Sequence, residues 1–382
     1  MKLAILTSTG EVGGAETIDL YTLAALAELG LELHAAIPAE GPLRHRLEEI
    51  GVRCYHIRSP EALNRLSRRY GSSDERSVIK IAGGLVRYES RVAGWLRAIR
   101  PDACIALGFR AQLALAPIAS ALRLPVAWIA ADFMPRDPLA CRVWSRIARR
   151  QPRVILTYSE AAARQPSLAD SPAVAVHPGV PLDRFPPGAD RRRPLLLMVG
   201  HLTPLKNHLG FLEVMRQVRD RVPNAKGVIA GRLEYRTASH VQYAERVAAA
   251  VAGFTPRGTV SLVSASNDEI GALLRKAAVL VHVSSVPETF GLVCAEAMAS
   301  RCPVVVFRRG ALPEVVGDAG VLVPPDDLAG MADACVDLLS DEDRWNDLAD
   351  RARARVVRLF GAKRCGTQSA SAIVSALHAR VT

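Results

Sequence analysis

The stretch "VPETFGLVCAEAMASRCPVVV", from Val286 to Val306, contains the pattern that decides the fold. Apolar, β-branched runs lie on both sides of its centre, "AAVLVHVSS" at 277–285 and "CPVVVF" at 302–307, and each predicts a buried strand. The segment between them, "GLVCAEAMASR", predicts a helix. Strand, helix and strand in this order indicate a parallel, doubly wound α/β sheet.

Two glutamates stand in this stretch with seven residues between them. Glu288 lies in a proline-flanked turn where the first strand has ended, and Glu296 lies in the first turns of the predicted helix. In open α/β sheets, ligands bind in the crevice beyond the carboxyl ends of the strands. Because small apolar residues surround Glu296, we expect its carboxylate inside a cleft rather than in open water. Two carboxylates, which only accept hydrogen bonds, suit a ligand with several hydroxyl groups.

The chain has 382 residues, which is too long for one ordinary core and fits two domains. Apolar residues make up 49% and charged residues 23%, as in an average soluble enzyme. The first residues, "MKLAILTS", predict a strand and lack the regions of a signal peptide. The longest apolar run, 111–131, is interrupted by prolines and an arginine, and we expect a buried helix followed by a buried strand.

The seven cysteines are scattered and form no Cys-x-x-Cys pair, so the sequence predicts neither a disulfide framework nor a zinc site. A reducing, cytoplasmic location is expected.

The net charge is +11 and is uneven, because residues 1–193 carry 27 Lys and Arg against 19 Asp and Glu. An N-terminal half with this positive charge could bind an anionic acceptor or the acidic inner face of a membrane. The alternative is that the charge has no functional role and reflects a GC-rich coding sequence, since only six of the 49 basic residues are lysine. The stretch from Arg65 to Arg100 mixes apolar and basic positions at near-helical spacing, which fits peripheral membrane contact or simply a solvated helix. No nucleic-acid partner is predicted.

Alternation of apolar runs with amphipathic runs predicts two consecutive doubly wound halves. The strands expected in the first half are Leu3–Thr7, Leu33–Ile37, Val52–Ile57, Ala103–Leu107, Val126–Ala130, Val154–Tyr158 and Val174–His177. Those expected in the second half are 194–200, 227–231, 259–263, 279–285, 303–307 and 320–324.

The segment from His177 to Pro194 holds five prolines and three consecutive arginines, which is typical of a domain linker. We therefore expect an N-terminal domain at 1–180 and a C-terminal domain at 194–360. A final helix at 361–382 is expected to cross back to the N-terminal domain.

Two loops have the character of anion sites. "STGEVGGAET" (8–17) joins the first strand to the first helix, and Gly13 and Gly14 allow a ligand close to the main chain. Its spacing is not that of a dinucleotide-binding loop, and a plain tight turn is the alternative. In "VGHLTPLKNH" (199–208), Lys206 precedes a helix N-terminus, which suits a phosphate; a solvated loop lysine is the alternative.

The segments "GGAE", "HPGVPLDRF", "VGHLTPLK" and "SSVPETFGLVCAEAMASRCPVVVFRRGALPEVV", in this order, resemble glycosyltransferase family 4. The resemblance covers nearly the whole chain and is strongest from Pro194 to Pro325. It implies the GT-B architecture, with two Rossmann-like domains facing a deep interdomain cleft. It also implies a retaining hexosyltransferase that uses a nucleotide-sugar donor, with UDP the expected nucleotide, and an unidentified acceptor in the N-terminal domain.

The resemblance also assigns roles to residues. Glu288 is expected to act catalytically by binding the donor sugar, Glu296 to bind the ribose, and Lys206 to neutralise the diphosphate. No metal and no cofactor are expected, because lysine and helix amides replace the divalent ion. The other residues expected to bind the sugar and the diphosphate are Gly13, Gly14, His201, Phe290, Gly291 and Leu292.

Three positions depart from the family's pattern. His201 stands where the family has arginine, and Ala131 followed by Asp132 stands where it often has a histidine close to the reacting sugar. Asp132 is therefore the second expected catalytic residue. Arg301 replaces a usual glycine.

Two other functions fit parts of the pattern. A non-catalytic subunit that binds a nucleotide sugar or a partner enzyme would explain the missing arginine and histidine, but not the intact Glu288, Glu296 and Lys206. A nucleotide-sugar epimerase would share the two-domain cleft but not the paired glutamates. Antibiotic, lipid and polysaccharide acceptors are all compatible with the sequence.

Overall fold

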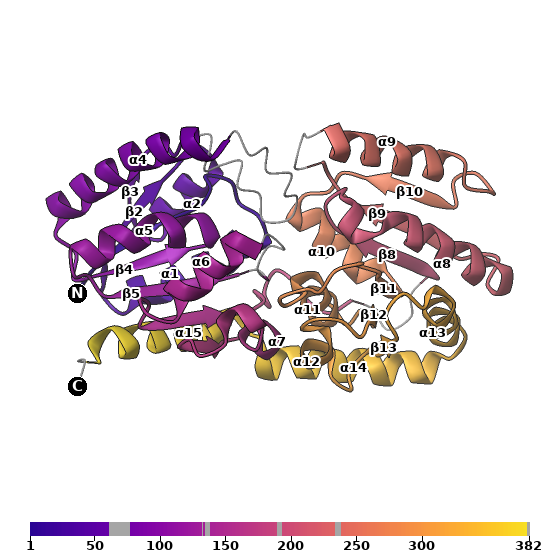
Figure 1. Ribbon diagram of the computed structural model, residues 1–382. Helices are drawn as coiled ribbons and strands as arrows, with labels where there is room; N and C mark the ends of the chain where they lie inside the picture. Colours follow the sequence, from indigo (N-terminus) through magenta and orange to yellow (C-terminus); the bar gives the residue numbers. More distant parts are fainter. Residues whose placement is uncertain (61–76, 132, 134–137, 189–192, 234–237, 380–382) are drawn as a thin grey trace. The chain divides into compact units, whose positions relative to one another are not determined.

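The computed structural model describes the chain except residues 61–76, 132, 134–137, 189–192, 234–237 and 380–382 (Figure 1). The chain forms two compact units. Unit 1 consists of Met1–Gly179 together with Lys363–Thr382, and unit 2 consists of Val180–Ala362.

Unit 1 contains a sheet of seven strands among the described residues, in the order β3-β2-β1-β4-β5-β6-β7, and all neighbours are parallel. The direction of winding reverses between β1 and β4, which is the point where doubly wound sheets bind ligands. The strands are β1 (Lys2–Leu6), β2 (Glu32–Ile37), β3 (Arg53–His56), β4 (Ala103–Leu107), β5 (Val126–Ala130), β6 (Val154–Thr157) and β7 (Ala173–Ala175).

Helices cover both faces of this sheet, because the side chains that its strands direct to either face are mostly apolar. Ala4 and Leu6 pack in one cluster with Val92, Leu115 and Trp144 from three helices, whereas alternate strand residues are buried on the other face. The helical elements of the unit are α1 (Gly14–Glu28), α2 (Pro42–Glu49), α4 (Ser77–Ile99), α5 (Phe109–Ala121), α6 (Pro138–Ala148), α7 (Glu160–Ala163), η1 (Pro166–Leu168) and α15 (Ala362–His378).

Unit 2 repeats this plan with six parallel strands among the described residues, in the order β10-β9-β8-β11-β12-β13. Its winding reverses between β8 and β11. The strands are β8 (Leu195–Val199), β9 (Lys226–Ala230), β10 (Val260–Val263), β11 (Val279–His282), β12 (Val304–Phe307) and β13 (Val321–Val323).

One face of the second sheet packs against α8, α9, α13 and α14, and α11 contacts β11 and β12. The helical elements are η2 (Pro204–Lys206), α8 (His208–Arg221), α9 (Ala238–Ala252), α10 (Asn267–Lys276), α11 (Leu292–Ala299), α12 (Leu312–Val316), α13 (Leu328–Ser340) and α14 (Glu342–Leu359).

The prediction of two doubly wound α/β halves is confirmed, and each predicted strand corresponds to an observed one. The largest difference is in β11, which ends at His282 rather than at Ser285. The chain turns there because the backbone N–H of Ser285 and the hydroxyl of Ser284 donate to the Leu205 carbonyl, at 2.9 and 3.1 Å.

Candidate functional site

The candidate site of unit 2 lies at the carboxyl ends of β8 and β11, where the winding reverses. The loop from Gly200 to Lys206 follows β8, and the turn that holds Glu288 follows β11. The two loops are tied together, because the Leu205 carbonyl also accepts a hydrogen bond from the Ser285 hydroxyl at 3.1 Å. The topology therefore brings together two segments that are about eighty residues apart in the sequence.

Glu288 lies at the centre of this site. Its Oε1 accepts a hydrogen bond from Lys206 Nζ at 2.6 Å and lies 3.5 Å from His282 Nε2. The side chain of Glu288 is 14% exposed and that of Lys206 is 20% exposed, so a ligand can reach both. Burial by itself would raise the pKa of Glu288, but Lys206 and His282 lower it well below its ordinary value of 4.5. Glu288 is therefore an ionised acceptor.

A third loop holds the backbone of Glu288 in place. Gly310 follows β12 with a φ of +60°, and a Cβ there would lie 2.5 Å from the Glu288 carbonyl oxygen. The N–H of Ala311 donates to the same oxygen at 2.9 Å. Arg309 donates to the Ser284 carbonyl at 3.1 Å and forms an ion pair with Asp326 at 2.7 Å. The approach of this loop thus requires glycine at position 310.

The start of α11 presents backbone N–H groups next to Glu288. Gly291 has a φ of +89°, and a Cβ at this position would lie 2.5 Å from Leu312 Cδ2. The first N–H groups of a helix have no acceptor within the helix, so those of Gly291 and Leu292 suit an anion. The Phe290 side chain is buried against Phe360, with ring centroids 5.4 Å apart, so Phe290 can serve a ligand only through its backbone.

Glu296 lies on α11, as predicted, between the buried Ala295 and Ala297. It is partly exposed. Burial raises its pKa to about 8, and the charge of Arg184 opposes this shift. Arg184 itself forms an ion pair with Asp268 at 2.9 Å. Glu296 thus gains less cationic support than Glu288 does.

His201 lies in the loop that carries Lys206 and is partly exposed. The next histidine along the chain, His208, is buried, and desolvation lowers its pKa to about 4. His208 contacts the Tyr243 hydroxyl through its backbone N–H at 3.0 Å and through Nδ1 at 3.3 Å. Of these two histidines, only His201 is accessible to a ligand.

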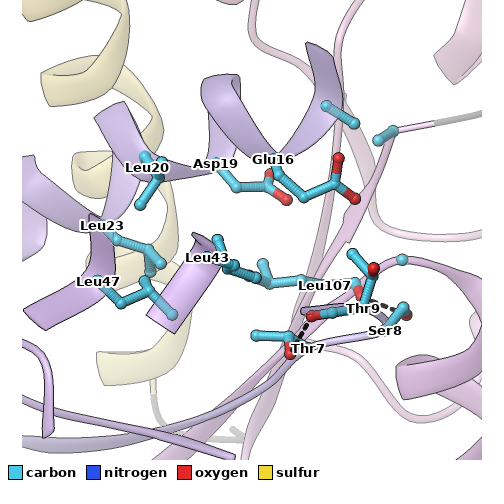
Figure 2. Close-up of a pocket in the computed structure, with 13 residues that line it drawn as sticks. Thr7, Ser8, Thr9, Glu16, Asp19, Leu20, Leu23, Leu43, Leu47 and Leu107 are labelled. Carbon is cyan, nitrogen blue, oxygen red and sulfur yellow. Dashed lines mark hydrogen bonds between the residues drawn. The ribbon is translucent and has the colours of Figure 1, made fainter. Parts of the chain in front are cut away.

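Unit 1 has a narrow pocket of its own at the carboxyl ends of β1 and β4 (Figure 2). Glu16 and Asp19 project from α1 on one side, and residues 7–9 form the opposite side. Its lining residues are Thr7, Ser8, Thr9, Ala15, Glu16, Asp19, Leu20, Leu23, Leu43, Leu47, Leu107, Gly108 and Ala131.

Of the residues predicted to act in unit 1, Gly13 caps α1 and its N–H donates to Glu16 Oε2 at 3.1 Å. Gly14 is exposed, and a Cβ there would meet no atom within 4 Å. Ala131 lines the pocket, whereas Asp132 lies outside the described residues, so its catalytic role stays a prediction.

Sequence reasoning missed His282 and Arg309. The signal for His282 was present, because it is the one polar residue in the apolar run that forms β11. Arg309 offered no such signal, since Arg308 stands beside it and only the fold shows which of the two turns towards Ser284.

Within the described ranges, no group of three or more His, Cys, Asp or Glu side chains is placed to hold a metal ion. The sequence contains one Asp-x-Asp pattern, Asp341 to Asp343, and Asp341 caps α14 by accepting the Arg344 N–H at 2.9 Å. No helix in the described part of the chain is both long and apolar enough to span a membrane.

The sequence is similar to a known family and to curated proteins. Residues 180–355 match the family described as glycosyl transferases group 1. The trehalose synthase of Rubrobacter xylanophilus is 30% identical over 171 residues, which are 44% of this chain and 40% of the relative. The D-inositol 3-phosphate glycosyltransferase of Mycolicibacterium smegmatis is 31% identical over 229 residues, 56% of this chain and 51% of the relative. The chain spans about half the length of these curated relatives or less.

Solved structures match nearly the whole chain. Anabaena Alr3699/HepE, solved in complex with UDP-glucose, has a TM-score of 0.81 and 18% identity, covering 98% of this chain and 100% of that chain. The sucrose-phosphate synthase of Thermosynechococcus elongatus has a TM-score of 0.78 and 18% identity, covering 98% and 99%. The fold of this chain is therefore that of the GT-B glycosyltransferases.

Proposed function

We propose that this chain, whose residues 180–355 belong to the group 1 glycosyl transferases, transfers a hexose from a UDP-sugar to an acceptor with retention of configuration. The observation that carries the proposal is the accessible pair of Lys206 and Glu288, 2.6 Å apart at the switch point of unit 2. A cation that can bind phosphate and a carboxylate that can accept hydrogen bonds from hydroxyl groups therefore lie side by side. Membership of glycosyltransferase family 4 is part of the same proposal.

The donor is held by groups that match its parts. Glu296 accepts from the ribose hydroxyls, and Glu288 accepts from the sugar hydroxyls. Lys206 neutralises the diphosphate with the help of His201 and the N–H groups at 290–292. A role of Gly13 and Gly14 in diphosphate binding is part of the same proposal. Because lysine and helix amides supply the positive charge, we propose a reaction that needs no metal.

In the reaction, the bond from the anomeric carbon to the diphosphate oxygen breaks as a bond to the acceptor oxygen forms on the same face. The acceptor hydroxyl gives its proton to the leaving phosphate oxygen, so no protein base is required. Lys206 and the amides stabilise the charge that develops on the diphosphate. A catalytic role of Asp132 is part of the same proposal.

The test is incubation with a panel of nucleotide sugars and measurement of nucleoside diphosphate release, with and without a chelator. We expect slow release from a UDP-sugar, unchanged by the chelator and abolished in Lys206→Ala. Proton NMR of a glycoside formed on an added alcohol should show the anomeric configuration of the donor, which a free sugar would lose by mutarotation. Binding of UDP without release from any donor would favour a non-catalytic subunit, and absence of both would overturn the proposal.

The acceptor is proposed to be presented at a membrane surface, and the support is the basic character of the N-terminal half. The basic stretch from Arg65 to Arg100 includes Trp95 on α4. Residues 65–76 of this stretch are outside the described part of the chain. Sedimentation with anionic vesicles at low and at physiological salt tests this contact. Absence of pelleting at both salt concentrations would rule it out.

A further inference from the structure

One carboxylate oxygen in unit 2 has two nitrogen neighbours. Glu288 Oε1 lies 2.6 Å from Lys206 Nζ and 3.5 Å from His282 Nε2. The two neighbours differ in accessibility, because the Lys206 side chain is 20% exposed and the His282 side chain only 5%. A ligand that enters the site can therefore contact Lys206 but not His282.

His282 is unusual for its position. It is the last residue of β11, whose other residues, 279–281, are apolar and almost fully buried. A buried polar side chain needs a hydrogen-bond partner. Within the described part of the chain, Nδ1 of His282 has none, and Nε2 faces Glu288. Since a carboxylate only accepts hydrogen bonds, Nε2 is the ring nitrogen of His282 that can donate to it.

We propose that His282 is a positioning residue that keeps the Glu288 carboxylate oriented while Lys206 engages the donor diphosphate. The inference rests on the proposed function, because it assigns Lys206 to the diphosphate and Glu288 to the sugar. An anionic ligand draws the flexible lysine ammonium towards itself and weakens its hydrogen bond to Glu288. The imidazole, which is fixed in a buried strand, stays in place.

The surroundings of Glu288 support this division of labour. Among the described residues, the Cys294 thiol of α11 also interacts electrostatically with Glu288; it is buried and its pKa is raised, so the thiol is neutral and cannot replace either nitrogen neighbour. Arg309 is directed to the Ser284 carbonyl and to Asp326. Among the described groups, His282 is thus the one that can hold the Glu288 carboxylate from its buried side.

The first experiment compares His282→Leu, which removes the donor, with His282→Gln, whose amide nitrogen can replace Nε2. We expect His282→Leu to lower kcat for nucleoside diphosphate release about tenfold and to change the donor KM by less than about threefold. His282→Gln should recover at least half of the lost activity on a logarithmic scale. His240→Leu removes another buried histidine of unit 2, on α9, and should leave kcat unchanged.

Unchanged kcat in His282→Leu, or a loss that His282→Gln does not recover, would overturn the inference. A second measurement needs no turnover. Chemical unfolding of His282→Leu, Glu288→Ala and the double variant should give non-additive changes in stability, because the two side chains interact. Additive changes would also overturn it. A wild-type protein that releases nothing from any donor overturns the proposed function instead, so the two failures are distinct.

Discussion

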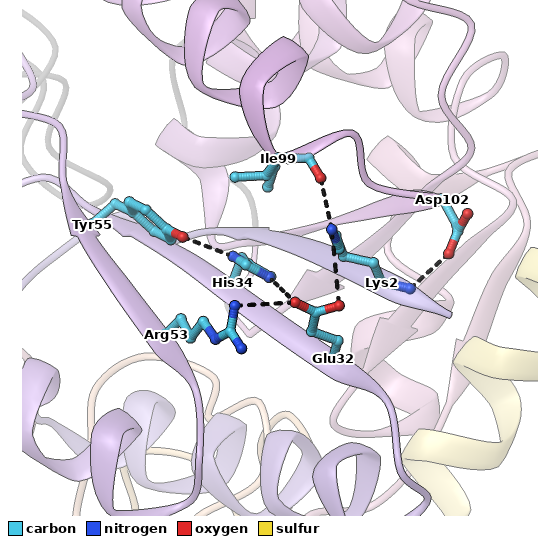
Figure 3. Close-up of polar contacts among 7 residues, drawn as sticks. All are labelled: Lys2, Glu32, His34, Arg53, Tyr55, Ile99 and Asp102. Atoms are coloured by element: carbon cyan, nitrogen blue, oxygen red, sulfur yellow. Dashed lines mark hydrogen bonds and ion pairs between the residues drawn. The ribbon is translucent and has the colours of Figure 1, made fainter.

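Two glutamates of this protein, one in each unit, have the same kinds of partners but different surroundings. Glu32 accepts from His34 Nε2 at 2.9 Å and lies 3.8 Å from Lys2 Nζ and 3.3 Å from Arg53 (Figure 3). Its side chain is 43% exposed, against 14% for Glu288. Both carboxylates have a lowered pKa, because hydrogen bonds and cations favour the charged form.

The difference lies in the end of the sheet at which each glutamate stands. Lys2, Glu32 and Arg53 are the first residues of β1, β2 and β3, so their cluster lies at the amino ends of the strands. Glu288 and His282 lie at the carboxyl ends, beside the start of α11. A carboxylate beside helix N–H groups can share a ligand with them, whereas one at the amino ends joins neighbouring strands. Residue types alone therefore do not identify a site.

The largest expected effect separates the two glutamates directly. Glu288→Ala should lower turnover of the donor by about 100-fold or more, because each hydrogen bond to a charged group contributes roughly 1.5–3 kcal/mol and the sugar loses several. Glu32→Ala should change turnover by less than about twofold. Nucleoside diphosphate release by the two variants is the measurement, and similar losses in both would contradict the comparison.

Glu296→Ala should weaken binding of bare UDP by about tenfold or more, because the ribose hydroxyls lose the carboxyl oxygens that accept their hydrogen bonds. Glu288→Ala should leave this affinity nearly unchanged, because bare UDP has no sugar for it to bind. Calorimetric titration of UDP into both variants tests the assignment. Equal weakening in the two would mean that the roles of ribose and sugar binding are wrongly divided.

His201 should give a smaller effect. His201→Arg should bind the donor more tightly than the wild type, by up to about tenfold, because arginine is always charged and can donate two hydrogen bonds to a diphosphate. Calorimetric titration of the donor into both proteins tests this. Equal affinities would show that the side chain at position 201 does not contact the phosphates.

Glu296 should also affect stability. Its pKa is raised from 4.5 to about 8, so the native state binds the proton more tightly than the unfolded state. The stabilisation is complete below about pH 4.5 and is lost as the pH rises towards 8. The melting temperature of Glu296→Gln should therefore decrease less than that of the wild type from pH 5 to pH 8. Parallel melting curves would show that this carboxyl titrates normally.

Glu32 should have the smallest effect on stability, and its pH dependence should be opposite to that of Glu296. Its pKa is lowered, chiefly by the hydrogen bond from His34, so its contribution to stability is present at neutral pH and is lost in acid. Glu32→Gln should melt slightly below the wild type at pH 7, and the gap should close in acid, where the wild-type carboxyl is protonated. A gap that widens in acid would contradict this.

The sequence predicted most of the fold, because buried parallel strands appear as short apolar runs and the helices between them are amphipathic. It also predicted that Glu288 and Glu296 stand at a strand end and on the following helix. It could not predict that Lys206 and Glu288 share a hydrogen bond, since this contact joins residues 82 apart and depends on β8 and β11 being neighbours.

The positions of His282 and Arg309 were missed for a related reason. Each has an alternative in the sequence that is equally plausible, a core histidine for one and a solvated arginine for the other. Which alternative holds is decided by contacts across three loops. Propensity and periodicity describe single elements and contain no information about such contacts.

The place of α15 has a consequence for synthesis on the ribosome. Its Gly366 packs against the Tyr21 carbonyl of α1, where a Cβ would lie 2.7 Å from that oxygen, and its Ile373 is buried. Unit 1 is thus completed by residues that are translated after the whole of unit 2. A nascent chain that has emerged as far as Gly179 still exposes the surface of α1 that α15 will cover. Premature termination before Lys363 would consequently damage the first unit to fold rather than the last.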